Sequence, residues 1–259
     1  MSCWLSVVVP ARDEEENIDA LVMALAQTGR KITERFPAAA KSGWECVIVD
    51  DNSQDGTPVR LDALCRRHAW LRTTTIRPPD GSGPRTAPGG QSAALYTGIR
   101  CSEGEIVAML DADLQNDPED LPDMLERLLS GGVDLVQGDR SKARRDTGVR
   151  RFGSAVGRIA RTLLLGDTVR DTGCTLRVLR RELALELPLE FRGMHRFIPV
   201  LTRDLGFTLL EHPVRHYPRI HGQSKYGRLG FARALPGLQD CFAVRWMRRR
   251  RTLRRPSDS

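Results

Sequence analysis

The stretch from Glu105 to Pro118 constrains this chain more than any other. It opens with a short apolar run, rich in Val and Ile, and turns acidic at Asp111 and Asp113. A buried strand over 106–110 would bring both carboxylates to its C-terminal end, where open α/β sheets bind their ligands. Carboxylates so close together repel each other unless a cation lies between them. The stretch therefore predicts a central strand followed by a metal site.

A third oxygen ligand, Gln115, lies in the same turn, and we expect it to bind Mg²⁺ or Mn²⁺ together with the two aspartates. A solvated turn before a helix would explain Asp117 as an N-cap but not the earlier pair. An EF-hand loop requires Gly and Glu at its sixth and twelfth places, which hold Asn116 and Pro122 here. A phosphatase-type aspartate nucleophile, which also follows a strand, stays open as an alternative.

Strand-like and helix-like segments alternate along the chain. The expected strands cover 5–9, 46–49, 73–76, 106–110, 133–137, 207–210 and 214–217, and the expected helices include 59–67, 91–99 and 121–129. This alternation is typical of an α/β protein with a mostly parallel, doubly wound sheet and helices on both faces.

Composition and missing motifs exclude several classes of protein. No Gly-x-Gly-x-x-Gly follows the first strand and no Gly-Lys-Ser/Thr occurs, which argues against dinucleotide oxidoreductases and P-loop proteins. The six cysteines have no paired spacing for zinc or disulfides, so we expect buried thiols in a reducing compartment. Neither a signal peptide nor an apolar run of ~20 residues is present, so we expect a cytoplasmic protein without a transmembrane span.

The C-terminal tail carries much of the net charge of +7. Its apolar residues can share one helical side: Phe231, Leu235, Leu238, Phe242, Trp246 and Met247. The run Arg248–Arg251 follows, and such a basic amphipathic segment suits the surface of an anionic membrane. Alternatively the helix packs on the core, with a break at Pro236–Gly237. With only 5% aromatic residues and no recognisable module, we expect no nucleic acid partner.

Five motifs in register cover most of the chain. They are Val7–Pro10 with Glu14, Glu15 and Asn17; Val49–Ser53 with Asp55–Thr57; Asp111–Gln115 with Pro118; Asp171–Arg177; and Arg219–Tyr226. Together they resemble family-2 glycosyltransferases, in particular those of the dolichol-phosphate mannose synthase type, which make polyprenyl-phosphate sugars. The resemblance implies a GT-A nucleotide-diphospho-sugar transferase fold over 1–227, with a nucleotide-binding half (1–110), a metal and acceptor half (111–227) and the tail as 228–259.

The resemblance also implies roles for individual residues. The donor nucleotide is expected to contact Pro10, Arg12, Glu14, Asp51, Asp111, Ala112, Gln115 and Arg140. The phosphates are expected to contact Arg219, Ser224 and Lys225. The catalytic set is expected to comprise Asp113, Asp171, Arg219 and Lys225. His195 and Arg196 either flank the acceptor phosphate or make local hydrogen bonds at a helix start.

The reaction expected from the resemblance is metal-dependent sugar transfer from a nucleoside diphosphate sugar to a polyprenyl phosphate at the cytoplasmic face of the membrane. A phosphate acceptor is already anionic, whereas a hydroxyl acceptor would need a general base, for which Asp171 is the first candidate. Alternatively, Asp171 caps a turn and pairs with Arg177. A non-catalytic scaffold that binds nucleotide sugars is the rival from another class. Two departures from the family pattern are a longer loop over 78–89 and Thr175-Leu176 in place of Gly-Phe.

Overall fold

The computed structural model describes residues 3–76, 89–141, 161–218 and 231–251, with the side chains of 231–236 left out of the description. The strands are β1 (Leu5–Ala11), β2 (Trp44–Asp50), β3 (Leu71–Thr75), β4 (Ile106–Met109), β5 (Leu135–Asp139), β6 (Arg177–Arg180) and β7 (Leu209–Pro213). The helices are α1 (Glu15–Arg35), α2 (Pro37–Ser42), α3 (Thr57–Arg67), α4 (Gln91–Cys101), α5 (Leu121–Ser130), α7 (Arg181–Glu186), α8 (Ile198–Asp204) and α9 (Phe231–Arg250), with 3-10 turns η1 (Pro118–Asp120) and η2 (Met194–Phe197).

Within the described residues, seven strands form one sheet in the order β3-β2-β1-β4-β6-β5-β7. Strands β1 to β4 run parallel, β5 and β7 run parallel to each other, and β6 is antiparallel to both β4 and β5. Every strand except β6 therefore ends at the same edge of the sheet, and β6 begins there. This arrangement confirms the expected mostly parallel α/β sheet.

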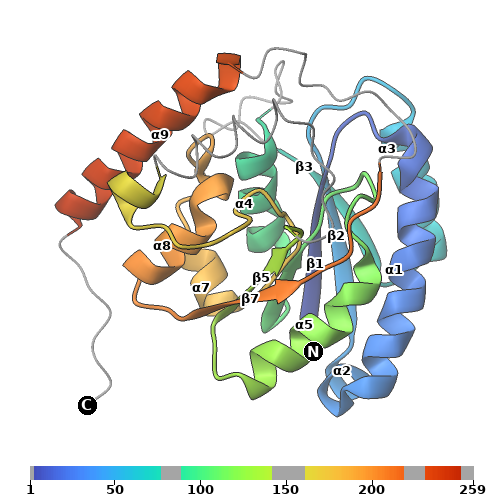
Figure 1. Cartoon of the computed structure of the whole chain (residues 1–259). Coiled ribbons are helices and arrows are strands. Elements are labelled where there is room, and N and C mark those ends of the chain that lie inside the picture. The colour runs from blue at the N-terminus through green and yellow to red at the C-terminus, as the bar shows by residue number, and fades with distance from the viewer. Residues whose placement is uncertain (1–2, 77–88, 142–160, 219–230, 252–259) are drawn as a thin grey trace.

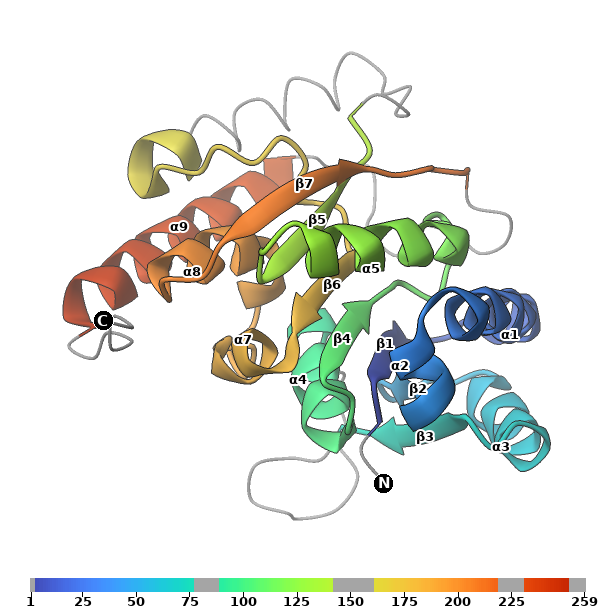
Figure 2. The same cartoon turned by 90° about the horizontal axis from the view of Figure 1, so that it is seen from below.

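Helices cover both faces of the sheet, as Figures 1 and 2 show. The central strands β1, β2, β4 and β5 are buried on both sides, whereas the edge strand β3 is mostly exposed. Alternate residues of β1 enter different core clusters. Val7 and Val9 pack with α1 and α5, whereas Val8 packs with α4, α7 and α8. The switch point of the sheet lies at β1, because chain order runs outward to β2 on one side and to β4 on the other.

The strand expected over 214–217 is wrong. After β7, Val214 donates one more backbone bond to Asp139, and the chain then leaves the sheet. His216 forms an isolated β-bridge with Asn116, in the turn that follows β4. The physical reason is that the turn after β4 offers the nearest backbone acceptors once β5 has ended.

Helix α9 packs on the α4–α8 side of the sheet. Cys241 and Val244 are buried in that cluster, and Met247 packs against it. The prediction that Met247 shares the outward apolar side of the tail is therefore wrong, because its position in the helix turns it toward the core. The helix continues through Pro236–Gly237, where a break was the alternative. Among the helices that the structure describes, none is long and apolar enough to span a bilayer.

All six cysteines are free thiols. Cys46, Cys174 and Cys241 are buried as expected, but Cys101 is exposed, because it is the last residue of α4 and faces solvent. Cys3 and Cys65 are half-buried, so the expectation that every thiol is buried is wrong at Cys3, Cys65 and Cys101.

Candidate active site

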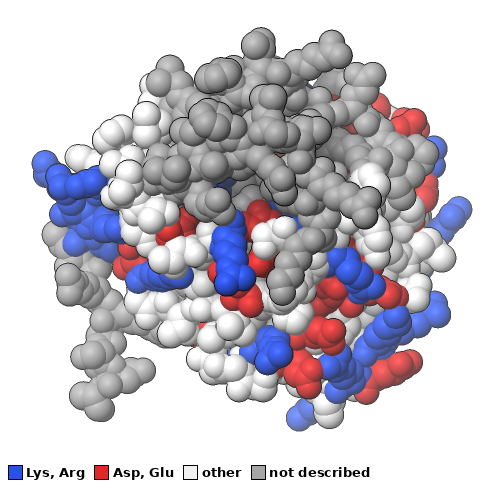
Figure 3. Space-filling model, in the orientation of Figure 1, with Lys and Arg blue, Asp and Glu red and all other residues white. Residues whose placement is uncertain are grey.

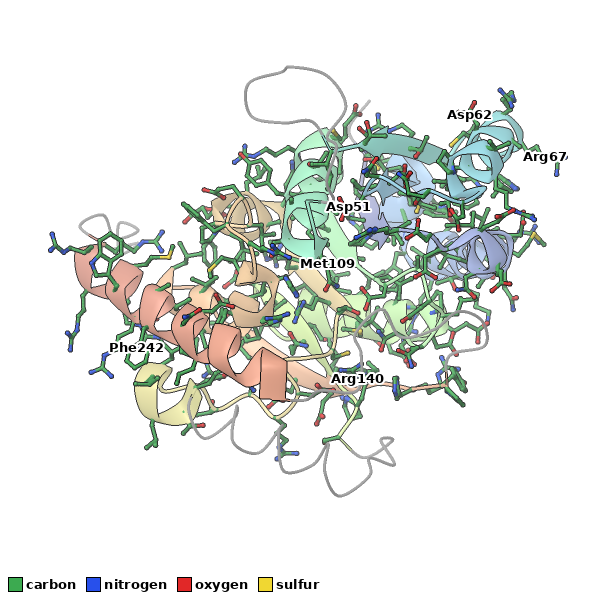
Figure 4. All side chains as sticks on the ribbon, turned by 90° about the horizontal axis from the view of Figure 1, so that it is seen from above. Asp51, Asp62, Arg67, Met109, Arg140 and Phe242 are labelled. Carbon is green, nitrogen blue, oxygen red and sulfur yellow. The ribbon has the colours of Figure 1, made fainter. Side chains whose placement is uncertain are left out.

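The turns that carry most of the predicted site residues meet at one edge of the sheet. Figure 4 looks onto this edge, with Asp51 following β2 and Arg140 following β5. The turns after β1, β4 and β7 and the segment before β6 reach the same edge, because of the strand directions. Residues that are far apart in the sequence are thereby brought into one region.

The turn after β1 is fastened to the turn after β2. Asp13 donates its backbone N–H to Ser53 Oγ at 2.9 Å, and its carboxylate accepts the N–H of Gln54 at 2.8 Å. The backbone N–H of Glu14 donates to Thr57 Oγ1 at 2.9 Å. Two of the predicted nucleotide-binding loops thus form one rigid unit. Pro10 lies within β1, and Arg12 lies 3.5 Å from the Asp13 carboxylate with 40% of its side chain exposed.

Asp51 joins β2 to the start of α4. Its two carboxylate oxygens accept the N–H groups of Gly89, at 2.6 Å, and Gly90, at 2.8 Å. The side chain is buried, and its backbone N–H donates to Ala11. The resemblance implied that Asp51 contacts the donor nucleotide; the structure adds that the same carboxylate fixes the start of α4. Each oxygen has a second lone pair, so a base N–H can still be accepted.

Asp111 is hydrogen-bonded on both oxygens directly after β4. Gln91 Nε2 donates to Oδ1 at 2.8 Å, and Thr175 Oγ1 donates to Oδ2 at 2.7 Å. The carboxylate of Asp113 is buried and accepts the backbone N–H of Gln115 at 3.1 Å. Burial, together with the charge of Asp113, raises the pKa of Asp111 to about 6. The Asp111 carboxylate is therefore held where the charge of Asp113 disfavours its ionisation.

This pair fits a hard divalent cation. In the part of the chain that the structure describes, no group of three His, Cys, Asp or Glu side chains is arranged to bind a metal. Mg²⁺ and Mn²⁺ commonly take one or two protein carboxylates and complete their coordination with substrate phosphates and water. Asp111 and Asp113, separated only by the buried Ala112, supply two carboxylates of that kind. The metal role of the Gln115 side chain stays a prediction.

Arg140 and Asp171 form a buried ion pair. Arg140 Nε and Nη2 donate to the two carboxylate oxygens at 2.8 and 3.2 Å, and its backbone N–H donates to Oδ2 at 3.1 Å. The expected alternative, a pair between Asp171 and Arg177, is wrong. Arg177 starts β6, and it donates from Nε to Gln137 Oε1 at 2.6 Å and from Nη2 to Thr172 O at 3.0 Å. Burial lowers the pKa of Arg177 to about 10.

His195 and Arg196 are neighbours in sequence but contact different elements. Ser92 Oγ lies 2.7 Å from His195 Nδ1 and accepts the backbone N–H of His195 at 3.1 Å, which ties η2 to the start of α4. Arg196 lies 3.8 Å from the carboxylate of Asp240 in α9. Of the two, only His195 is brought to the first turn of α4, beside the Gln91 that holds Asp111.

Burial lowers the pKa of His195 to about 3, so the imidazole is neutral in the folded protein. The unfolded chain takes up this proton near pH 6.5, and each pH unit below that value costs about 1.4 kcal/mol of folding free energy. Stability is therefore lost as the pH falls from 6.5 toward 3. We expect His195→Gln to remove about 2.3 kcal/mol of the stability difference between pH 6.5 and 4.5, because half of the unfolded chains already carry this proton at pH 6.5.

Urea unfolding of both proteins at each pH measures this difference. The raised pKa of Asp111 increases stability as the pH falls, because the folded state takes up that proton at a higher pH than the unfolded state. This contribution is the same in both proteins, so it cancels in the comparison. Equal pH slopes for the two proteins would contradict a neutral His195.

The chain after β7 runs beside the acidic turn. Tyr217 donates its backbone N–H to Gln115 O at 2.9 Å, and Arg215 binds the Asp120 carboxylate through Nε at 2.8 Å. The predicted phosphate-binding residues Arg219, Ser224 and Lys225 follow immediately in sequence and lie outside the described residues. The arginines of 144–151 and the loop over 78–88 lie outside them as well.

Several polar residues of the site were not predicted from the sequence. They are Gln91, Ser92, Gln137 and Thr175. The one available signal was the departure from Gly-Phe at Thr175-Leu176, which places a hydroxyl where the family pattern has none. The other three bind site residues that are 20 or more positions away, so local spacing carries no sign of them.

Two solved structures share this fold. Glucosyl-3-phosphoglycerate synthase from Mycobacterium tuberculosis, crystallised with Mn²⁺, UDP-glucose and phosphoglyceric acid, superimposes with a TM-score of 0.63 at 21% identity, over 95% of this chain and 79% of that chain. TarS from S. aureus, crystallised with UDP, superimposes with a TM-score of 0.57 at 17% identity, over 96% of this chain and 66% of that chain. These matches confirm the expected GT-A type of fold.

Sequence relatives cover most of the chain. An undecaprenyl-phosphate 4-deoxy-4-formamido-L-arabinose transferase from Pseudomonas paraeruginosa is 32% identical over 93% of this chain and 65% of its own length. A dodecaprenyl-phosphate galacturonate synthase from Rhizobium johnstonii is 32% identical over 87% of this chain and 62% of its own length. The chain thus spans slightly less than two thirds of each relative. A family model, glycosyl transferase family 2, matches residues 6–187, and the chain therefore belongs to this family.

Proposed function

We propose that this protein transfers a sugar from a nucleoside diphosphate sugar to a polyprenyl phosphate. The observation that carries the proposal is the pair of a half-buried Asp111 and a buried Asp113 after β4, in a chain whose relatives are named for polyprenyl-phosphate acceptors. The bond between the anomeric carbon and the diphosphate oxygen breaks, and an oxygen of the acceptor phosphate forms the new bond. The nucleoside diphosphate leaves with the electron pair, so a single displacement inverts the anomeric carbon.

On the donor side, the joined turns after β1 and β2 would hold the nucleotide, with Asp51 accepting from the base. The carboxylates of Asp111 and Asp113 would hold Mg²⁺ or Mn²⁺, which acts as a Lewis acid on the leaving diphosphate. Arg219 and Lys225 are proposed to neutralise the remaining charge of that group. Because Gln91 and Thr175 orient the Asp111 carboxylate before the reaction, this group needs little reorganisation as charge develops on the leaving group.

The Arg140–Asp171 pair supports a phosphate acceptor over a hydroxyl acceptor. A general base must offer a lone pair to the proton it removes. The Asp171 carboxylate instead accepts three hydrogen bonds from Arg140 and is buried, so these bonds compete for the lone pairs that a base would use. A polyprenyl phosphate is anionic and needs no such base. The guanidinium of Arg140 adds a positive charge at the edge of the sheet that the phosphate would approach.

The test is transfer by the full chain from a panel of UDP- and GDP-sugars to a short-chain polyprenyl phosphate, with Mn²⁺ or Mg²⁺ present. We expect one donor to yield a lipid-linked sugar and EDTA to stop the reaction. Transfer only to a free sugar hydroxyl would favour the hydroxyl-acceptor alternative. Binding of nucleotide sugar without any transfer would favour the non-catalytic scaffold and contradict the proposal.

We also propose that α9 rests on the surface of an anionic membrane, where a polyprenyl phosphate would be embedded. Leu238, Phe242 and Trp246 follow each other at one-turn spacing and are 38%, 56% and 61% exposed. Cys241 and Val244 face the core, so these three form an outward apolar stripe. Figure 3 shows Lys and Arg side chains gathered where α9 ends, and each arginine near an anionic surface adds about 1 kcal/mol.

The double change Phe242→Ser and Trp246→Ser should weaken binding to anionic phospholipid vesicles by roughly 10- to 100-fold, because two large apolar side chains no longer enter the interface. Vesicle co-sedimentation measures this. The matched control is Met23→Ser with Val59→Ser, which removes two exposed apolar residues, 66% and 74% exposed, from α1 and α3. Equal loss in the two double variants would contradict docking through α9.

A further inference from the structure

Thr175 connects two motifs of the site through its hydroxyl. Its Oγ1 donates to Asp111 Oδ2 at 2.7 Å and lies 3.1 Å from Asn116 Nδ2. The amide nitrogen of Asn116 can only donate, so the hydroxyl proton of Thr175 is left for the carboxylate. The orientation of that amide is supported by Cys174, whose Sγ donates to Asn116 Oδ1 at 3.7 Å. Asn116, Thr175 and Asp111 thus form a chain of hydrogen bonds with a fixed direction.

A buried network holds the segment that carries Thr175. Gln137 Nε2 donates to the backbone oxygens of Asp171 and Cys174 at 3.2 and 3.0 Å. Arg177, which is 1% exposed, donates to Thr172 O at 3.0 Å. Both side chains start from neighbouring strands of the sheet, β5 and β6. The hydroxyl of Thr175 is therefore placed by the core of the protein, although the segment itself is a turn.

Rotation of the Asp111 carboxylate is limited from two sides. Gln91, the first residue of α4, holds Oδ1 at 2.8 Å, and Thr175 holds Oδ2. These donors come from elements that pack on different parts of the sheet, so a turn of the carboxylate about its χ2 angle breaks at least one of the two bonds. One lone pair of each oxygen remains for a cation. Outer hydrogen bonds of this kind orient metal ligands and affect metal affinity.

We propose that Thr175 is a positioning residue for Asp111, fixing the carboxylate in the orientation that binds the divalent cation jointly with Asp113. This inference rests on the proposed function. A side chain without a hydroxyl at this position could not make the contact. The hydroxyl of Thr175 contacts Asp111 and Asn116, so its proposed effect on the cation runs through Asp111.

The test compares Thr175→Val with Thr175→Ser in the full chain. Valine keeps the shape but loses the hydroxyl, whereas serine keeps the hydroxyl. We expect the Kd for Mn²⁺, measured by titration calorimetry with and without UDP, to rise about 10- to 100-fold in the valine variant and to stay near the wild-type value in the serine variant. The Mn²⁺ concentration for half-maximal transfer should rise in parallel, with a smaller change in the rate at saturating Mn²⁺.

Thr73→Val is the structural control, because Thr73 Oγ1 donates to Ile48 O at 3.2 Å in β3, outside the site segments. It should lower stability without changing the Kd for Mn²⁺. Wild-type binding of Mn²⁺ with no weakening in Thr175→Val, or equal weakening in Thr175→Val and Thr73→Val, would overturn the positioning role alone. Failure of the wild-type protein to bind Mn²⁺ at all would overturn the proposed function and this inference with it.

Discussion

Replacing Asp113 with alanine is expected to lower the rate of sugar transfer by about 1,000-fold or more, because the metal contributes several kcal/mol to stabilising the leaving diphosphate. The side chain is buried beside Asp111 at the end of β4. Its removal leaves one carboxylate where the proposed site needs two. The initial rate of transfer at saturating donor measures this, and nucleotide binding should lose its dependence on Mn²⁺ in the same variant.

The matched control is Asp62→Ala. Asp62 lies on α3, far from the site in Figure 4, and its carboxylate makes only an exposed pair with Arg66 at 3.6 Å. This variant should transfer sugar at the wild-type rate. Stability of Asp113→Ala should not fall, since removing one of two mutually repelling carboxylates relieves strain. A folded Asp113→Ala protein with a rate within tenfold of wild type would contradict the proposed metal site.

Replacing Arg140 with methionine is expected to lower the free energy of unfolding by about 3–5 kcal/mol, because it leaves the carboxylate of Asp171 buried and without its partner. Both side chains of the pair are nearly buried, at 10% and 6% exposure, and the two hydrogen bonds from the Arg140 side chain are lost together. Urea unfolding near neutral pH measures the change. The backbone N–H of residue 140 still donates to Asp171, so the loss should lie toward the lower end of this range.

Two further variants test the cause. Adding Asp171→Leu to Arg140→Met removes the uncompensated charge, so the double variant should recover part of the lost stability. Arg66→Met removes an arginine from an exposed pair on α3 and should change the unfolding midpoint very little. A double variant less stable than the sum of both single changes would contradict the charge explanation.

Local sequence was sufficient to predict much of the sheet and the centre of the site. The apolar run before Asp111 became β4, and the same reasoning located β1, β2 and β3 within a few residues. The predictions succeeded because a strand buried on both faces needs a continuous apolar run, and a parallel strand delivers the next residues to the binding edge. Asp117 caps η1 as expected, since it accepts the N–H of Glu119.

Tertiary structure decided how the polar residues of the site are paired. Strand β6 lies antiparallel between β4 and β5, and no local sequence pattern predicts that position in the sheet. Because of this insertion, Asp171 forms its ion pair with Arg140, 31 positions away, and not with the nearby Arg177. It also places Thr175 against Asp111, across 64 positions.

The sequence by itself determined that acidic side chains end a buried strand and that the tail is an amphipathic basic helix. Only the folded chain decided which donors orient Asp111, and which side of α9 faces solvent once Cys241 and Val244 enter the core. The physical reason is the range of the interactions. Hydrophobic periodicity and strand ends are set within a few residues, whereas hydrogen bonds and ion pairs depend on which strands become neighbours.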